Sequence, residues 1–479
     1  MGVYSRFVQV FFLAIVVTAV IASGFLGPER VSASPEESPI PDNQATLKVP
    51  FTQFKLDNGL RVVLSEDHSA PVVAVTVYFD VGSRNETPGH TGFAHLFEHM
   101  MFQGSENVPR GAYFKFIESN GGDVNATTHV DFTDYYEFLP SNCLALALWL
   151  ESDRMRSLKI TQESLDNQRK AVEEEKRLSV DNQAYWPELD KMDRNIFHNW
   201  AFGHSTFGSM HDLEAASVGD VKHFFDTYYV PNNAVLAICG DIDTSEARAL
   251  VQRYFASIPA RKLPPPVDAS ESPGARVPKA VAIDSHAEVP EIVVAWKIAQ
   301  RSSPDKYAIA LLKAVLADGD SCRLYQDLVK KKEVAVSVTG GLEEDRGPSD
   351  LYFQIVHKPE IPPGRVEAAL VAEVNQIKTE GISPEELATV KNQYRLGRFL
   401  GTGDDEHRNP QTALGRAMDL AEFTLFDGDP SLINTELDRY MAVKASDIQA
   451  VARKYLTPLN RSVFYIQTAH HRSGPASRG

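Results

Sequence analysis

The chain has 479 residues, which is too long for one domain of average size, and 43% of them are hydrophobic, a globular proportion that excludes a largely disordered protein. The formal net charge of −16 argues against nucleic acid as a partner. Three widely spaced cysteines, Cys143, Cys239 and Cys322, predict no disulfide framework, and we expect small buried side chains at these positions.

The N-terminal segment predicts export. Arg6 is the only charged residue before an apolar run from Val8 to Leu26, and Val31-Ser32-Ala33 offers a small-residue cleavage site. We interpret residues 1–33 as a secretory signal peptide. Because the apolar run is long, an uncleaved membrane anchor is the alternative interpretation.

A polar linker, residues 34–49, precedes the first predicted strands. Residues 51–83 hold two β-rich runs on either side of Asp57-Asn58-Gly59, which is a hairpin signal. A helical region follows from about residue 91, and residues 119–140 predict two strands separated by a turn. Helical patterns then extend over residues 143–179, and residues 220–242 predict a helix, a turn and a strand.

The Pro-rich stretch at residues 263–278 breaks this pattern and predicts an interdomain linker. Beyond it the sequence repeats: the segment from Asp447 resembles the segment from Asp220, and in both a proline follows eleven positions later, Pro458 and Pro231. This repeat predicts two related halves.

We place the boundaries of these parts from composition and from the repeat. The first half spans residues 50–262, the second spans residues 279–470, and residues 471–479 form a tail.

The segment His95-Leu96-Phe97-Glu98-His99 is the strongest chemical signal. On a helix, positions 95, 98 and 99 share one face, so His95 and His99 could bind one zinc ion. Glu98 would lie beside them as the general base that takes a proton from water and passes it to a leaving amine. The alternative is an ordinary amphipathic helix with two structural histidines.

A catalytic zinc needs a third protein ligand. Residues 165–178 predict a helix that carries Glu173, Glu174 and Glu175, and the residues alone leave the choice among them open. A run of glutamates is otherwise typical of a solvated helix face. The apolar residues of this segment predict its buried side: Leu165, Ala171, Val172 and Leu178.

These motifs resemble the pitrilysin family of zinc metallopeptidases, which includes insulin-degrading enzyme and the mitochondrial processing peptidases. The inverted motif H-x-x-E-H is typical of this family of inverzincins. Its third ligand is a glutamate in a segment E-R-x-x-V-x-x-E, which this chain matches at Arg169, Val172 and Glu175, 76 residues after His99.

The resemblance implies a role for each matching residue. His95, His99 and Glu175 would bind one Zn²⁺ per chain, Glu98 would be the catalytic base, and Glu173 and Glu174 would face solvent. Gln168 stands where the family has glutamate; it can still form hydrogen bonds that support the site, but it brings no charge.

A further match is the family's N-A-x-T segment, which lines the cleft on an edge strand to which substrate backbone adds. By this likeness Asn125 and Ala126 would contact substrate. The alternative for Asn125 is a turn residue after Gly121-Gly122.

The resemblance implies an α+β fold with two homologous tandem halves, each a β-sheet packed against helices. It also implies a zinc-dependent metalloendopeptidase of the short bacterial type that hydrolyses peptides or unfolded segments. The N-terminal segment predicts that this protein is periplasmic or tethered to the inner membrane. Short members pair as homodimers or heterodimers.

One departure concerns the partner. Active long members carry an arginine and a tyrosine seven residues apart in the second half, where this chain has Val329 and Val336, and valine cannot donate a hydrogen bond. We therefore expect a homologous partner subunit to supply the Arg and Tyr. The alternative function is a catalytically silent scaffold or assembly subunit of the same family. A metal-storage protein fits less well, because the chain has no His-rich tract and storage does not explain Glu98.

Overall fold

The computed structural model describes residues 48–400 and 409–469, so the predicted signal peptide and the C-terminal tail lie outside the described residues. The strands are β1 Thr52–Lys55, β2 Arg61–Glu66, β3 Val72–Phe79, β4 Asp123–Thr128, β5 Thr133–Pro140, β6 Ala234–Gly240, β7 Lys279–Asp284, β8 Glu291–Ile298, β9 Ala335–Glu343, β10 Ser349–His357 and β11 Arg461–Thr468.

The helices of the first half are α1 Phe93–Met100, α2 Ala112–Glu118, α3 Leu144–Ser157, α4 Gln162–Lys176, α5 Trp186–Leu189, α6 Met192–Ile196, α7 Met210–Ala215, α8 Val218–Tyr228 and α9 Thr244–Phe255. Those of the second half are α10 Lys306–Ala317, α11 Pro363–Glu380, α12 Pro384–Leu400, α13 Ala413–Glu422, α14 Leu432–Ala442 and α15 Ala445–Tyr455. Among the described residues, no helix or strand lies between α9 and β7, where the Pro-rich stretch falls.

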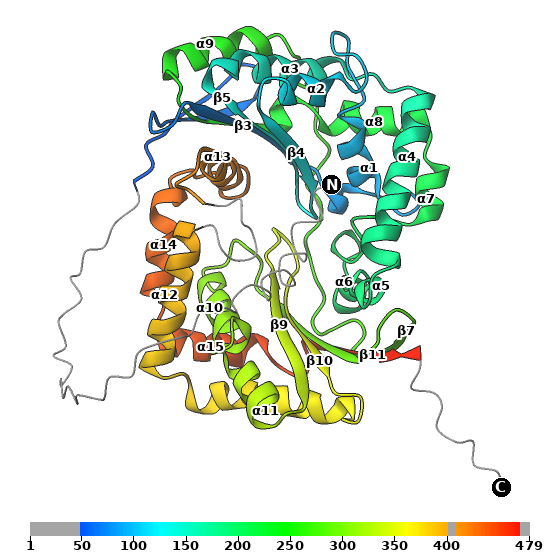
Figure 1. Ribbon diagram of the computed structural model, residues 1–479, viewed down its shortest axis with the longest axis vertical. Coiled ribbons are helices and arrows are strands. Elements are labelled where there is room, and N and C mark those ends of the chain that lie inside the picture. The colour runs from blue at the N-terminus through cyan, green and yellow to red at the C-terminus, as the bar shows by residue number, and fades with distance from the viewer. Residues whose placement is uncertain (1–47, 401–408, 470–479) are drawn as a thin grey trace, which may run out of the picture.

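The two sheets confirm the internal repeat. The first has the order β1-β2-β6-β3-β5-β4 and the second has the order β7-β11-β8-β10-β9. Strands β7 to β11 thus take, in chain order, the places of β2 to β6, and the one parallel pair of each sheet is equivalent, β2 with β6 and β7 with β11. The α+β fold with two homologous halves is therefore confirmed (Figure 1).

The repeated sequence segments start their helices in the same way. Asp220 accepts a hydrogen bond from the backbone N–H of Ser217 (3.0 Å), and Asp447 accepts one from that of Lys444 (2.9 Å), each at the start of a helix. Carboxylates at this position satisfy free N–H groups of the first turn. The predicted hairpin is also present, with β1 antiparallel to β2 around Gly59, whose φ is 93°.

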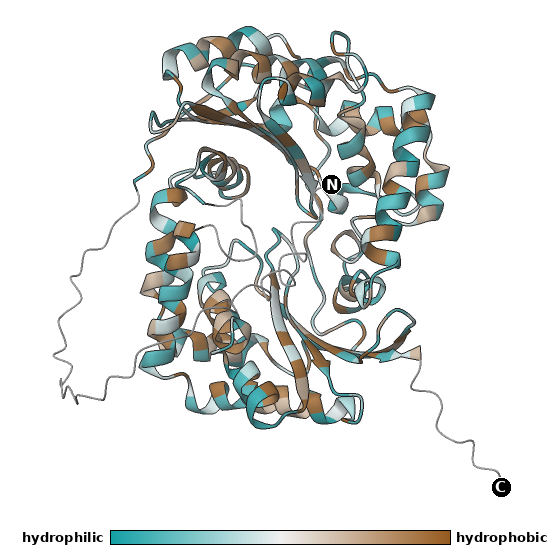
Figure 2. Cartoon of the chain, in the orientation of Figure 1, coloured by the Kyte–Doolittle hydropathy of each residue, from teal (hydrophilic) through white to brown (hydrophobic). Residues whose placement is uncertain are grey.

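Each half covers one face of the other half's sheet. Helix α13 of the second half packs on β2, β3 and β6 of the first sheet, and its Ala417, Leu420 and Ala421 are fully buried there. Figure 1 shows α13 on the inner face of the sheet that contains β3, and Figure 2 shows that sheet as largely apolar. Burial of this apolar surface holds the two halves together as one body.

The reverse contact is made by the first half. Ile196 of α6 and Phe202, in the short helical turn η6 Trp200–Phe202, pack on Val293 and Phe464 of the second sheet. Gly347 makes room for this contact, because a Cβ at that position would lie 2.2 Å from the Phe202 ring. The exchange of helices is therefore reciprocal. The domain boundaries drawn from the sequence stay predictions.

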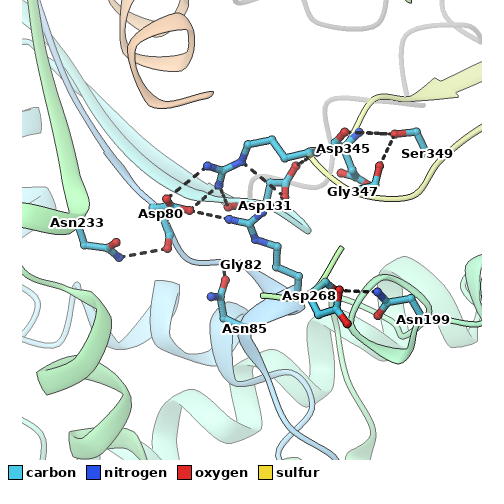
Figure 3. A network of polar contacts seen from close by, with 12 residues as sticks. Asp80, Gly82, Asn85, Asp131, Asn199, Asn233, Asp268, Asp345, Gly347 and Ser349 are labelled. Atoms are coloured by element: carbon cyan, nitrogen blue, oxygen red, sulfur yellow. Dashed lines mark hydrogen bonds and ion pairs between the residues drawn. The ribbon is translucent and has the colours of Figure 1, made fainter. Parts of the chain in front are cut away.

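A network of charges adds to this interface. Arg346, in the loop between β9 and β10, pairs with Asp80 of the first half (2.5 Å), and its backbone N–H donates to Asp131 (2.6 Å). Arg84 binds the same two carboxylates at 2.7 and 2.6 Å (Figure 3). Each of the two aspartates thus accepts hydrogen bonds from both arginines at the interface between the halves. Part-buried ion pairs contribute to stability when the charged groups are hydrogen-bonded in this way.

The three cysteines are buried and free, as expected. Over the two described ranges, no helix is long and apolar enough to cross a membrane.

A buried carboxylate seam lies beside the second sheet. Asp350 is fully buried, and neither of its carboxylate oxygens has a hydrogen-bond partner among the described residues. Burial and the nearby carboxylates of Asp193, Glu343 and Asp345 raise the pKa of Asp350 well above its usual range. Lys297, its register partner on β8, donates instead to Glu271 at 2.5 Å. Burial likewise raises the pKa of Asp193 to about 7.

The packing of α13 predicts that the halves unfold together. Leu420→Ala should lower the free energy of unfolding by about 2–5 kcal/mol, because it leaves a cavity in a buried contact. The control is Leu396→Ala on α12, where the side chain is 57% exposed and the change should stay within about 0.5 kcal/mol. Urea denaturation followed by circular dichroism and fluorescence should give one shifted transition by both probes. Two separate transitions, one for each half, would contradict the reciprocal packing.

The carboxylate seam predicts a pH-dependent stability. Because the pKa of Asp350 is raised in the folded state, this carboxyl keeps its proton in the folded protein above about pH 4, where it ionises in the unfolded chain, so its contribution to stability falls as the pH rises. Asp350→Asn removes this loss. The free energy of unfolding of the variant minus that of the parent should grow from near zero at about pH 4 to at least about 1 kcal/mol at about pH 8. A difference that does not change with pH would show that Asp350 does not titrate in this way.

Candidate active site

The helix that carries the H-x-x-E-H motif is held at its N-terminus by a buried carboxylate. Helix α1 follows Gly92, whose φ is 82° and which has no side chain to cap the helix. Glu86 caps it instead, accepting hydrogen bonds from the backbone N–H groups of Gly92 (2.9 Å) and Ala94 (2.8 Å). His204 Nε2 lies 3.0 Å from the same carboxylate. A carboxylate at this end also interacts favourably with the helix dipole.

The structure brings the three predicted metal ligands together. His95 Nε2 lies 3.7 Å from Glu175 Oε1, and His99 Nε2 lies 3.1 Å from Glu175 Oε2. One possible ligand atom from each residue lies within 4.8 Å of the others. Among the described residues, these three are the group of His, Cys, Asp or Glu side chains that could hold a metal ion. Helices α1 and α4 pack side by side, so the predicted ligands come from two neighbouring helices.

The unpartnered atoms and the pKa shifts of these residues favour the binding of a cation. His99 Nε2 and Glu175 Oε1 are buried and have no hydrogen-bond partner among the described residues, although they face each other's side chains. Burial and the neighbouring His99 lower the pKa of His95 to about 3, so its imidazole is neutral. Burial opposes the ionisation of Glu175, but contact with His99 and His95 outweighs it and lowers the pKa to about 2. Two imidazoles and one carboxylate are a donor set that fits Zn²⁺.

Glu98 lies next to this group without belonging to it. Its side chain is buried, and Thr128 Oγ1 donates a hydrogen bond to Glu98 Oε2 at 2.6 Å. Burial raises the pKa of Glu98, with His99 and Thr128 opposing the shift. A carboxylate with a raised pKa, close to a metal site but outside its ligand set, is suited to carry protons.

The structure corrects two expectations for α4. Glu174 is exposed and pairs with Arg177, but the side chain of Glu173 is only 15% exposed, so the expectation that it faces solvent was wrong. The apolar pattern also failed in part. Leu165 and Val172 are fully buried, whereas Ala171 is exposed and Leu178 is 46% exposed. The α-helix ends at Lys176 and a π-helical turn follows, so the helical period no longer applies at position 178.

Two residues of the matching segment support α4 in different ways. Arg169 donates to the backbone carbonyls of Leu213 and Ala216, both at 2.7 Å, and thereby ties α4 to α7. Gln168 is buried two turns before Glu175, and among the described residues no hydrogen bond joins its side chain to the three ligands. Its supporting role stays a prediction.

Strand β4 is an edge strand of the first sheet and contacts α1. Ala126 is 1% exposed and faces the core that contains α1, so any contact with substrate would use its backbone. Asn125 alternates with it and points to the opposite face, half-buried, with its Oδ1 accepting from the N–H of Ala126 (2.9 Å). Asn125 lies within the strand rather than in the preceding turn.

Val336 lies on the equivalent edge strand of the second sheet, and Val329 lies in a helical turn that contacts this strand. Val329 is in the π-helical turn η8 Tyr325–Lys331 and packs on the second core. Val336 is the unpaired residue of a bulge in edge strand β9, between Ala335 and Ser337 in the register with β10, and its side chain is 56% exposed. Among the described residues, no arginine makes a hydrogen bond or ion pair with the four residues of the site.

Sequence reasoning missed several residues that shape the site. Thr128 was within reach, because it is the last residue of the N-A-x-T segment that singled out Asn125 and Ala126. Glu86 and Phe207, whose ring lies 5.0 Å from that of His95, had no local signal, since their partners are distant in sequence.

Two family models match the chain and together span more than half of it. The model described as Insulinase (peptidase family M16) matches residues 61–207, which include His95, Glu98, His99 and Glu175. The model described as Peptidase M16 inactive domain matches residues 215–394, in the part that lacks the H-x-x-E-H motif.

Individual relatives agree with these matches. The chain is 25% identical to the zinc protease PqqE of Helicobacter pylori, over 86% of this chain and 91% of that protein. It is 25% identical to a probable mitochondrial-processing peptidase subunit beta of Arabidopsis thaliana, over 86% of this chain and 77% of that protein. The crystal structure of a protease from Helicobacter pylori superposes with a TM-score of 0.80 at 25% identity and covers 88% of this chain and 99% of that chain. These findings confirm the resemblance seen in the sequence, and the chain belongs to peptidase family M16, the insulinase or pitrilysin family.

Proposed function

We propose that this chain is a zinc-dependent metalloendopeptidase that hydrolyses peptides or unfolded segments, and that it is the zinc-bearing subunit of a dimer. The observation that carries the proposal is the grouping of His95, His99 and Glu175 within 4.8 Å, with Glu98 beside the group but outside it. We place the protein in the exported compartment, periplasmic or tethered to the inner membrane, because of its N-terminal segment.

The residues of the site would divide the work. His95, His99 and Glu175 would hold one Zn²⁺, which supplies Lewis acidity to the scissile carbonyl and to the attacking water when it is bound. Glu98 would accept a proton from the water as it attacks the carbonyl carbon, and would return the proton to the leaving amine nitrogen. The edge of β4, with Asn125 and Ala126, would hold the peptide backbone as an added strand.

The proposal of a partner subunit follows from the absence of an arginine and a tyrosine at positions 329 and 336. An oxyanion donor contributes about 10²–10³ in rate, and Val329 and Val336 cannot supply one. A homologous subunit that brings an arginine and a tyrosine would complete the site, and a homodimer is the alternative pairing. Pairing is in keeping with the relative that is named as a subunit of a processing peptidase.

The first measurement is peptide hydrolysis by zinc-loaded protein that starts at residue 34, with and without a chelator. With the homologous partner present, we expect chelator-sensitive cleavage, and Glu98→Gln should lower kcat by at least about 10²-fold because the general base is lost. The variant should still bind one zinc. Loss of the metal in Glu98→Gln would instead make Glu98 a ligand.

The same assay separates the alternatives. Robust cleavage by the chain alone would refute the argument from Val329 and Val336 while the peptidase function stands. Stoichiometric zinc without cleavage, alone and with homologous subunits of family M16, would favour the silent scaffold.

Metal affinity tests the register of α4. Glu175→Gln should weaken zinc binding by about 10-fold or more, because one charged ligand is lost. Glu174→Gln is the matched control, since this neighbouring carboxylate is exposed and pairs with Arg177, and its zinc affinity should equal that of the parent. Competition with a zinc-sensitive dye measures both. The reverse pattern would show that the neighbouring glutamate is the ligand.

A further inference from the structure

Thr128 makes the one hydrogen bond that the Glu98 carboxylate accepts among the described residues, from its Oγ1 to Glu98 Oε2 at 2.6 Å. The two residues are thirty positions apart, one on α1 and the other at the end of β4. The contact engages Oε2 of the carboxylate and leaves Oε1 without a hydrogen bond to any described residue. A base that must exchange protons with water and with an amine needs one free oxygen of this kind.

The donor itself is held firmly. Thr128 pairs in register with Thr133 of β5, and Thr133 donates from its hydroxyl to the carbonyl of Val81 at 2.9 Å. A β-branched side chain has few χ1 rotamers, so the sheet fixes the place of the Thr128 hydroxyl. Glu98, in contrast, has a long side chain that a single helix position does not fix. The hydrogen bond from Thr128, which the sheet holds in place, therefore restricts the conformation of the Glu98 carboxylate.

We propose that Thr128 is a positioning residue for the general base Glu98, so that the edge strand to which peptide would add also aims the carboxylate at the reacting atoms. This inference rests on the proposed function. Strand β4 would then both bind the peptide and position the Glu98 carboxylate. The sheet would therefore set the distance between the bound peptide and this carboxylate. Displacement of a reacting group by about 1 Å can cost about 10²-fold in rate.

The test compares three variants in the assembly that hydrolyses peptide. Thr128→Val keeps the shape and removes the donor, Thr128→Ser keeps the donor, and Thr127→Val makes the same change on the neighbouring residue, whose hydroxyl points to Asp134 on the other face. We expect Thr128→Val to lower kcat by about 10- to 100-fold with KM within about twofold. Thr128→Ser and Thr127→Val should stay within about threefold of the parent. A parallel rise in KM, or an equal loss in Thr127→Val, would indicate damage to the strand and overturn the proposal.

Two further readouts separate positioning from a structural role. In a Glu98→Gln background, single-turnover measurements should show no further loss from Thr128→Val, because the hydroxyl acts through the carboxylate. An additional loss of tenfold would overturn the proposal. Zinc stoichiometry and affinity of Thr128→Val should equal those of the parent.

A crystal structure of Thr128→Val gives a result that does not depend on activity. We expect the Glu98 carboxylate to leave its place beside β4, and an unmoved carboxylate would overturn the proposal even if no peptide were cleaved. Full activity of Thr128→Val with an inactive Glu98→Gln would also overturn it while the peptidase function stands. If Thr128→Val does not fold, Thr128→Ala provides the same comparison.

Discussion

The reciprocal packing of helices across the two halves is the constraint on which the rest of the structure depends. Helix α13 closes the inner face of the first sheet, and α6 with Phe202 closes that of the second. Without these contacts each sheet would expose a large apolar face to water, which is unfavourable. The predicted metal ligands lie on α1 and α4, which pack in the core on the other face of the first sheet. The site therefore depends on a sheet that needs both halves to be complete.

The electrostatics of the site follow from burial. His95 and Glu98 are almost completely enclosed, and enclosure disfavours the charged form of each. Glu175 stays ionised because two imidazoles lie against it. Position in the fold thus makes His95 neutral, keeps Glu175 anionic and raises the pKa of Glu98, with no unusual residue type.

Much of the fold and of the site could be predicted from the sequence, because the relevant signals are local. The hairpin at Gly59, the strands around Asn125 and the helix with His95 each follow from short patterns of turn residues and hydrophobic period. The exchange of α6 and α13 could not be predicted, since each helix has an ordinary pattern and only the fold shows which sheet it covers. The burial predicted for Leu178 was wrong because a π-helical turn changes the helical period. The contact of Thr128 with Glu98 could not be predicted, because the two residues are thirty positions apart in the sequence.

The alternation of side chains along β4 has a consequence for selectivity. Ala126 and Val124 point into the core and Asn125 points to the opposite face, so the strand's free edge offers mainly backbone N–H and C=O groups. Every peptide carries the same complementary groups, whatever its side chains. A chain that pairs there would be recognised by its ability to become extended, so an unfolded protein would be accepted at many points and a helix or a tight turn refused. Discrimination among amino acids would have to come from surfaces further along the bound peptide.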